Sequence, residues 1–255
     1  MKLLLTSGGV TNTRIHSALV DLLGTPMAES QARCIPTAPW GHPLYGPASV
    51  RGVVVGAPPH YMSGLGWTSV GVLERTARPS IGMERWVPWV VAADVLLVDG
   101  GDATYRCHGM RQSGLADLLP SLPATVWVGV RVASMVLPPR IGASFVAWPS
   151  APDDRTLGVV DGSIFPHLDA FPTNTLADAA RWAADLSVPA YAIDEPTAIT
   201  VVDGSVEVVS EGNGKRVGGR TPTPAFQPPM RVGCCTHAPG RSAMRQLPPH
   251  GQRHG

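Results

Sequence analysis

Cysteine, charged residues and long apolar runs are all scarce in this sequence. Only four of the 255 residues are cysteine, too few for a disulfide-bonded scaffold, so we expect the reducing conditions of the cytoplasm. Charged side chains make up only 15% of the chain. No stretch approaches the roughly 18 apolar residues of a membrane span, and the apolar run from Leu3 to Leu5 is too short for a secretion signal. The sequence therefore predicts a protein that is neither secreted nor held in a membrane.

Acidic residues are absent from the C-terminal end. Seven of the 20 Lys and Arg residues follow Glu211, but none of the 19 Asp and Glu residues does. The rest of the chain is therefore acidic and lacks the basic surface that a nucleic-acid backbone requires, so we expect no nucleic-acid partner. Residues 212–255 are rich in Gly, Pro and Arg without periodicity, which predicts a disordered tail after a single domain at 1–211.

No motif in the sequence requires a metal ion or an organic cofactor. Cys234, Cys235 and His237 are metal-ligand types, but no second cluster at suitable spacing completes a tetrahedral site. Cys107 and His108 are neighbours, and consecutive residues of a helix point in different directions, which disfavours a catalytic Cys–His pair. We therefore expect no cofactor.

Short apolar runs recur along the chain, and helical patterns separate several of them. One helical pattern ends at Gly24, and another begins with a capping box at Thr175. Continuous apolar strands separated by helices are typical of a mostly parallel sheet with helices on both faces. We therefore predict a three-layer α/β fold with a C-terminal β-hairpin that turns at Asp203 and Gly204, and a long surface loop over 36–59. The predicted strands are 3–5, 53–55, 95–98, 126–130, 190–193, 199–202 and 206–209.

The loops that follow the predicted strands are the places to search for a site, because open parallel sheets bind ligands at the carboxyl ends of their strands. The strand at 95–98 leads into a Gly100-Gly101-Asp102 turn and then into a helix that begins near Thr104. Such a turn directs backbone N–H groups into a cleft, and its glycines let a ligand approach the main chain. Gly100 and Asp102 are therefore candidate ligand-binding residues.

The strand at 126–130 turns abruptly into a short helix, as at the nucleophile elbow of a hydrolase. Small residues stand two positions either side of the apex, at Gly129 and Ala133, as this tight turn requires. The apex itself is Arg131, whose guanidinium stays protonated and cannot act as a nucleophile.

Two later loops carry the residue types of a general base and its supporting acid. His167 follows one probable strand, and Asp194 and Glu195 follow the next. A His and a carboxylate that arrive from successive loops are what such a pair requires.

Together these loops resemble those of the dipeptidase E and cyanophycinase family of serine peptidases, whose fold is related to class I glutamine amidotransferases. The resemblance runs from Met1 to about Glu211. In that family the elbow reads Gly-x-Ser-Ala-Gly-Ser, its Ser attacks the peptide carbonyl, a His acts as base, and an acidic residue supports the His. The resemblance implies the base role for His167 and the acid role for Glu195, with Asp194 as the alternative.

The sequence departs from this family pattern at the nucleophile. Arg131 stands where the serine belongs, Val132 replaces Ala, and Ala133 replaces Gly. Ser134 matches the second serine, but it lies three residues beyond the apex, about 4.5 Å along a helix, and is a poor surrogate nucleophile. By the same resemblance, the backbone N–H groups of Gly101 and Val132 would form the oxyanion hole.

Three hypotheses follow, of which the first two assign functions from different classes. The resemblance implies a serine peptidase for small, aspartyl peptides, impaired or inactive because Arg131 replaces the nucleophile. Alternatively, the retained cleft binds a small peptide or acidic small molecule through Arg131, since Arg suits bidentate recognition of carboxylates. A third hypothesis is a degraded or misassembled reading frame, which the irregular 36–59 region and the unpatterned tail would favour. A homo-oligomer also remains open.

Overall fold

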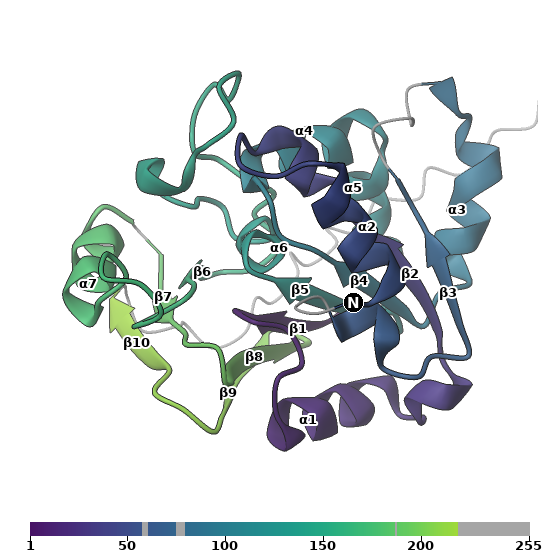
Figure 1. Cartoon of the computed structure of the whole chain (residues 1–255), viewed down its shortest axis with the longest axis horizontal. Coiled ribbons are helices and arrows are strands. Elements are labelled where there is room, and N and C mark those ends of the chain that lie inside the picture. The colour runs from purple at the N-terminus through teal and green to yellow at the C-terminus, as the bar shows by residue number, and fades with distance from the viewer. Residues whose placement is uncertain (58–60, 75–79, 187, 219–255) are drawn as a thin grey trace, which may run out of the picture. The chain divides into compact units, whose positions relative to one another are not determined.

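The computed structural model describes residues 1–57, 61–74, 80–186 and 188–218, all within one compact unit, Met1–Pro224. Its centre is a seven-stranded sheet of order β3-β2-β4-β5-β1-β8-β9 (Figure 1). Neighbouring strands from β3 to β1 pair in parallel, whereas β8 and β9 pair antiparallel at one side. The strands are β1 (Lys2–Thr6), β2 (Gln31–Ile35), β3 (Ser69–Val72), β4 (Val95–Val98), β5 (Val126–Val130), β8 (Thr197–Val202) and β9 (Ser205–Ser210).

Helices cover both faces of this sheet. On one face, Ile15 of α1 belongs to the same buried cluster as Val128 of β5. On the other face, Trp86 of α3 and Met110 of α4 belong to a cluster with Trp127 of β5. The helices are α1 (Thr13–Leu23), α2 (Pro47–Val55), α3 (Met83–Val91), α4 (Ala103–Gln112), α5 (Leu115–Leu118), α6 (Val132–Met135) and α7 (Leu176–Ala184), with short 3-10 helices η1 (Met27–Glu29), η2 (Ala38–Gly41), η3 (Tyr61–Gly64), η5 (Leu119–Ser121) and η6 (Ala143–Phe145).

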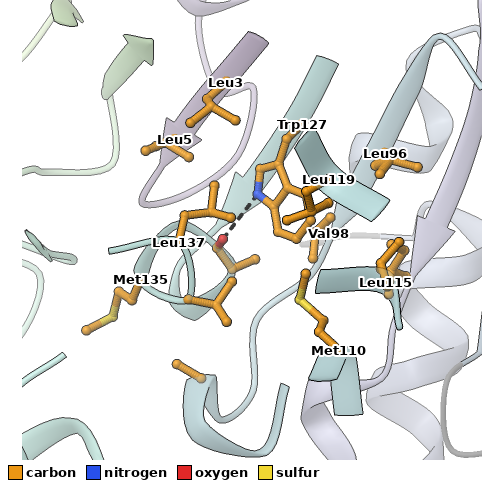
Figure 2. Packing of buried hydrophobic residues seen from close by; sticks show 14 of the residues in the cluster. Leu3, Leu5, Leu96, Val98, Met110, Leu115, Leu119, Trp127, Met135 and Leu137 are labelled. Carbon is orange, nitrogen blue, oxygen red and sulfur yellow. Dashed lines mark hydrogen bonds between the residues drawn. The ribbon is translucent and has the colours of Figure 1, made fainter. Parts of the chain in front are cut away.

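Burial on both faces explains the continuous apolar runs of the central strands. Every residue of β5 is buried, and successive side chains point to opposite faces of the sheet. Figure 2 shows one of the two resulting clusters, in which Trp127 packs with Leu3 and Leu5 of β1 and with Leu96 and Val98 of β4. Strands buried in this way position the loops at their carboxyl ends, where the candidate site lies.

A second, three-stranded sheet follows the order β10-β7-β6. β6 (Ser163–Phe165) pairs in parallel with β7 (Ala190–Ala192), and β10 (Lys215–Gly218) pairs antiparallel with β7. α7 packs on this sheet through Trp182, whose ring meets the ring of Phe165 edge-on at 5.5 Å between centroids. The loops after β6 and β7 carry the predicted His and acid.

The structure confirms the predicted fold class, a mostly parallel sheet between helices with a C-terminal hairpin. At the hairpin turn, Asp203 and Gly204 have φ of 49° and 80°, as a primed two-residue turn requires. α1 ends at Gly24 in the left-handed conformation. Thr175 and Asp178 form the predicted capping box of α7.

Three predictions about the chain's organisation are wrong. Region 36–59 is not one long loop, because η2 and α2 lie in its described part, and the apolar run predicted as a strand at 53–55 is the last turn of α2. The predicted tail at 212–255 begins too early, because β10 adds a strand to the second sheet. The remainder of that tail, 219–255, lies outside the described residues, as do Cys234, Cys235 and His237.

Across the described ranges, no helix has the length and apolar character that crossing a membrane would require.

Candidate active site

The Gly100-Gly101-Asp102 turn connects β4 to α4, as predicted. Gly101 has φ of 127°, and a Cβ there would lie 2.1 Å from the carbonyl carbon of Ala38, so only glycine fits against η2. A Cβ on Gly100 would lie 3.2 Å from Cδ of Arg131. The aliphatic part of the Arg131 side chain therefore covers this glycine.

Asp102, a candidate ligand-binding residue, is buried and bonded to the protein's own groups. Its Oδ1 accepts hydrogen bonds from Thr104 Oγ1 at 2.5 Å and from Tyr105 N at 2.7 Å, which caps α4. Its Oδ2 accepts from the backbone N–H groups of Ala147 and Trp148 at 2.8 and 2.9 Å. Asp102 thus joins the turn to the loop after η6, and its carboxylate is already fully engaged.

The elbow between β5 and α6 has the strained geometry that its sequence predicts. Arg131 at the apex has φ of 56° and ψ of −119°, unusual for a residue with a side chain. A Cβ on Gly129 would lie 2.8 Å from the carbonyl oxygen of Ala133, so the turn closes too tightly for a larger residue. The same carbonyl accepts a hydrogen bond from Trp127 Nε1 at 3.2 Å, drawn as the dashed line in Figure 2. The core therefore supports the elbow from below.

The serine closest to the apex in sequence faces the interior. Ser134 has no exposed surface. Its Oγ accepts a hydrogen bond from the N–H of Thr6 and lies within donating distance of the carbonyl oxygens of Thr6 and Gly129, all at 2.9 Å. This hydroxyl ties the elbow to β1 and is not presented to a ligand.

His167 and Glu195 come together from the loops after β6 and β7, as predicted. His167 Nδ1 and Glu195 Oε1 form a hydrogen bond and an ion pair when the imidazole is protonated. His167 has φ of 58°, a strained value for a non-glycine residue, and its hydrogen bond to Glu195 orients the ring. The Glu195 side chain keeps 42% of its surface exposed, so the pair can be reached from solvent.

Asp194, the alternative acid, lies in a different set of contacts. Its Oδ1 accepts a hydrogen bond from Thr197 Oγ1, and its Oδ2 accepts from the N–H of Asn213 at 2.5 Å. These contacts organise the start of β8 and the chain before β10. Of the two neighbouring carboxylates, only Glu195 contacts His167 in the described structure.

Ser7 is a site residue that sequence reasoning missed. It has no exposed surface, and its Oγ accepts a hydrogen bond from the N–H of His167 at 2.7 Å. The same oxygen lies 3.5 Å from Glu195 Oε1, to which it donates. The available signal was its position, since Ser7 directly follows β1 at the carboxyl edge that carries the other site loops.

The glycine after Ser7 makes room for the acid. A Cβ on Gly8 would lie 1.9 Å from Oε2 of Glu195. The hydrogen bond from His167 is the main factor that lowers the pKa of Glu195 below 4.5, and partial burial opposes it. The positive charge of Arg131 lowers this pKa further. Glu195 is therefore a carboxylate at neutral pH, and it interacts electrostatically with Arg131 at the elbow apex.

The N–H groups predicted for the oxyanion hole belong to Gly101 and Val132. Within the described part of the chain, neither N–H donates a hydrogen bond to the protein. Val132 follows the apex directly, and Gly101 lies in the turn beside the Arg131 side chain. Neither N–H group is therefore satisfied by a protein acceptor in the described ranges.

Other candidate groups do not form a second site. Cys107 is buried, and the ring of His108 packs against Trp148 at 5.0 Å, so the two point to different surroundings, as predicted. Among the described residues, no group of three or more His, Cys, Asp or Glu side chains is placed to hold a metal ion.

The site places an elbow, a Gly-Gly-Asp turn and a His–Glu pair on one chain in the order that the resemblance implied. The sequence pattern of peptidase family S51 matches residues 3–209, nearly all of the described part. The chain belongs to peptidase family S51. The resemblance to the dipeptidase E family is thereby confirmed, and this S51 chain carries an arginine at the apex of its elbow.

Solved structures share the fold of this S51 chain. One is the crystal structure of a candidate peptidase E protein from Listeria monocytogenes EGD-e, with a TM-score of 0.62 and 15% identity over 83% of this chain and 98% of that one. Another is a peptidase from an acI-B1 Actinobacterium, with a TM-score of 0.61 and 18% identity over 86% of this chain and 91% of that one. No curated protein matches the chain significantly.

Proposed function

We propose that this S51 chain binds a small acidic peptide or amino acid in the family's cleft and does not hydrolyse it at a peptidase's rate. The observation that carries the proposal is Arg131 at the apex of the elbow, with φ of 56°. The backbone keeps the shape that presents a nucleophile, but the side chain it presents is a permanent cation. Such a group attracts a carboxylate and cannot attack a carbonyl.

The burial and hydrogen bonds of Ser7 and Ser134 support the absence of hydrolysis. Ser134 Oγ is buried and held by the backbone of Thr6 and Gly129. Ser7 Oγ is buried as well, and it accepts a hydrogen bond from the backbone of His167. Loss of a triad nucleophile removes several orders of magnitude in rate. We therefore expect no hydrolysis beyond the small residual rate that a peptidase keeps after loss of its nucleophile.

The surroundings of Arg131 support binding of a carboxylate. The N–H groups of Gly101 and Val132 donate to no acceptor in the described chain, and they complement a guanidinium as donors to an anion. The positive charge of Arg131 lowers the pKa of Glu195, but the carboxylate of Glu195 is already paired with His167. The expected ligand is a small peptide or acidic small molecule. We expect the protein to act in the cytoplasm, either as a homo-oligomer or as a monomer.

The peptidase hypothesis is the second candidate, and the retained His167–Glu195 pair favours it. In a serine peptidase such a pair activates the hydroxyl at the apex. The elbow offers the pair no hydroxyl, since Arg131 occupies the apex. The hydroxyl that does contact the pair is that of Ser7, which is buried and lies 3.4 Å from His167 Nδ1. Activity in this chain would therefore require a nucleophile other than the one that the elbow presents.

Calorimetry with the dipeptide Asp-Leu tests the binding function. We expect measurable heat at millimolar ligand for the unmodified chain, and about a tenfold weaker affinity for Arg131→Gln, because a charge-assisted contact is lost. Arg14→Gln is the matched control, since Arg14 is an exposed residue of α1. Absence of heat from the unmodified chain, or equal affinities for Arg131→Gln and Arg14→Gln, would remove the support for this function.

A hydrolysis assay on the same dipeptide separates the two candidates. We expect release of leucine only after Arg131→Ser, Val132→Ala and Ala133→Gly together restore the family's elbow pattern. Equal, substantial release by the unmodified chain would show that another group is the nucleophile.

A further inference from the structure

An exposed aromatic side chain stands beside the imidazole of the site. The ring of Phe171 meets the ring of His167 edge-on, with 5.7 Å between centroids. Phe171 keeps 55% of its surface exposed. A large apolar ring that remains in water loses the free energy that its burial would supply. A side chain of this kind next to a ligand site is suited to cover an apolar part of the ligand.

The backbone around Phe171 is held in place, so the ring is presented at a fixed position. The carbonyl of Phe171 accepts a hydrogen bond from Asn174 N at 3.0 Å, and Asn174 Nδ2 donates to the carbonyl of Pro166 at 3.2 Å. Asp169 has φ of 60°, and its N–H donates to the carbonyl of Asn174 at 2.8 Å. The turn therefore closes on itself between His167 and α7.

The position relative to His167 indicates which part of a ligand meets the ring. In the serine-peptidase arrangement, the imidazole stands on the side of the amine that leaves, because it delivers a proton to that nitrogen. A residue beside the imidazole therefore faces the second residue of a dipeptide, after the peptide bond. Phe171 is next to the ring of His167 and is apolar, so it complements an apolar second side chain.

We propose that Phe171 determines specificity by packing against the second side chain of a bound dipeptide, so that the preferred ligand combines an acidic first residue with an apolar second one. This inference rests on the proposed binding function and deepens it. Arg131 recognises a carboxylate, which every aspartyl dipeptide offers, and Phe171 distinguishes one such dipeptide from another.

The test compares Asp-Leu with Asp-Gly, which carry the same charges and differ in the second side chain. In calorimetry the unmodified chain binds Asp-Leu about fivefold more tightly, as expected for partial burial of a leucine side chain against one ring. Phe171→Ala reduces this ratio to less than about twofold and leaves the affinity for Asp-Gly unchanged. Phe171→Leu, which keeps an apolar surface, retains most of the preference.

A matched control is Trp89→Ala on α3, because Trp89 also keeps 55% of its surface exposed. It leaves both affinities and their ratio unchanged. α3 lies on the opposite side of the drawing from α7, which follows the Phe171 turn (Figure 1). Loss of the preference in both alanine variants would attribute it to general damage and overturn the proposal.

Two further outcomes separate this inference from the function on which it rests. If both dipeptides bind through Arg131 but Phe171→Ala keeps the ratio of the unmodified chain, the role of Phe171 is overturned and the binding function stands. The same holds if the unmodified chain does not distinguish the dipeptides. If neither dipeptide binds the unmodified chain, both proposals are overturned.

Discussion

The serine hydroxyls differ in what a sequence can reveal about them. Ser134 stood out by its spacing from the elbow, yet its Oγ faces the backbone of Thr6 and not the site. Ser7 carried no motif, yet it lies between His167 and Glu195. Spacing along the chain predicts which loop a residue occupies. It does not predict the direction of a side chain, because that depends on contacts with strands far away in sequence.

The hydrogen bonds of Ser134 predict a structural role that can be measured. Ser134→Ala leaves the buried N–H of Thr6 without an acceptor, so we expect the free energy of unfolding to fall by about 2 kcal/mol. Urea unfolding measures this change. Ser17→Ala is the control, since Ser17 is exposed on α1 and its loss leaves stability nearly unchanged. Labelling of Ser134 by a serine-reactive phosphonate in the folded protein would contradict this assignment.

At the scale of elements, local signals predicted the parts of the fold that carry the site. The apolar runs of β4 and β5, the glycines after β4 and the small residues around Arg131 all act within a few residues, so they could be recognised without the tertiary structure. α2 was missed because its Pro-rich surroundings and the Val run at 53–55 indicated a loop and a strand. β2 and β3 were missed because they are short and partly polar or exposed, whereas β6 was expected only as an unbounded strand before His167.

The contacts of Asp102 link the start of α4 to the loop after η6, and a substitution measures how much this link stabilises the protein. Its carboxylate caps α4 and also accepts from the N–H groups of Ala147 and Trp148. In Asp102→Asn an amide NH₂ faces two N–H donors, or the cap of α4 is lost, so we expect a loss of about 2 kcal/mol of stability. Thermal unfolding followed by tryptophan fluorescence measures it.

The control for Asp102→Asn is Asp21→Asn, which changes an exposed carboxylate on α1. We expect that variant to unfold within a degree or two of the unmodified chain, in line with the small effect of exposed charges. Equal unfolding temperatures for the two variants would show that the Asp102 contacts do not hold the loop after η6.

At the scale of the whole molecule, the two sheets bring together residues that the sequence keeps apart. Ser7 and Arg131 follow strands β1 and β5 of the seven-stranded sheet, and His167 and Glu195 follow β6 and β7 of the three-stranded sheet. The contacts of Ser7 with His167 and Glu195 join the two sets. The rule that ligands bind at the carboxyl ends of strands predicted the loops that carry three of them. The choice between Asp194 and Glu195 required coordinates, because adjacent residues of one loop face different partners.

Burial in or against the seven-stranded sheet determines the chemical behaviour of two cysteines. Cys34 in β2 is fully buried, and burial raises the pKa of its thiol to about 12, while Cys107 in α4 is buried and its thiol pKa is raised as well. Because the thiolate is the reactive form, a thiol whose pKa is raised in this way is almost entirely unreactive near neutral pH, even before access is considered. We therefore expect iodoacetamide to leave both residues unmodified in the folded chain and to alkylate both in urea, as measured by peptide mass mapping. Alkylation of Cys34 faster than global unfolding would mean that β2 opens by itself, which a strand paired on both sides in the central sheet should not do.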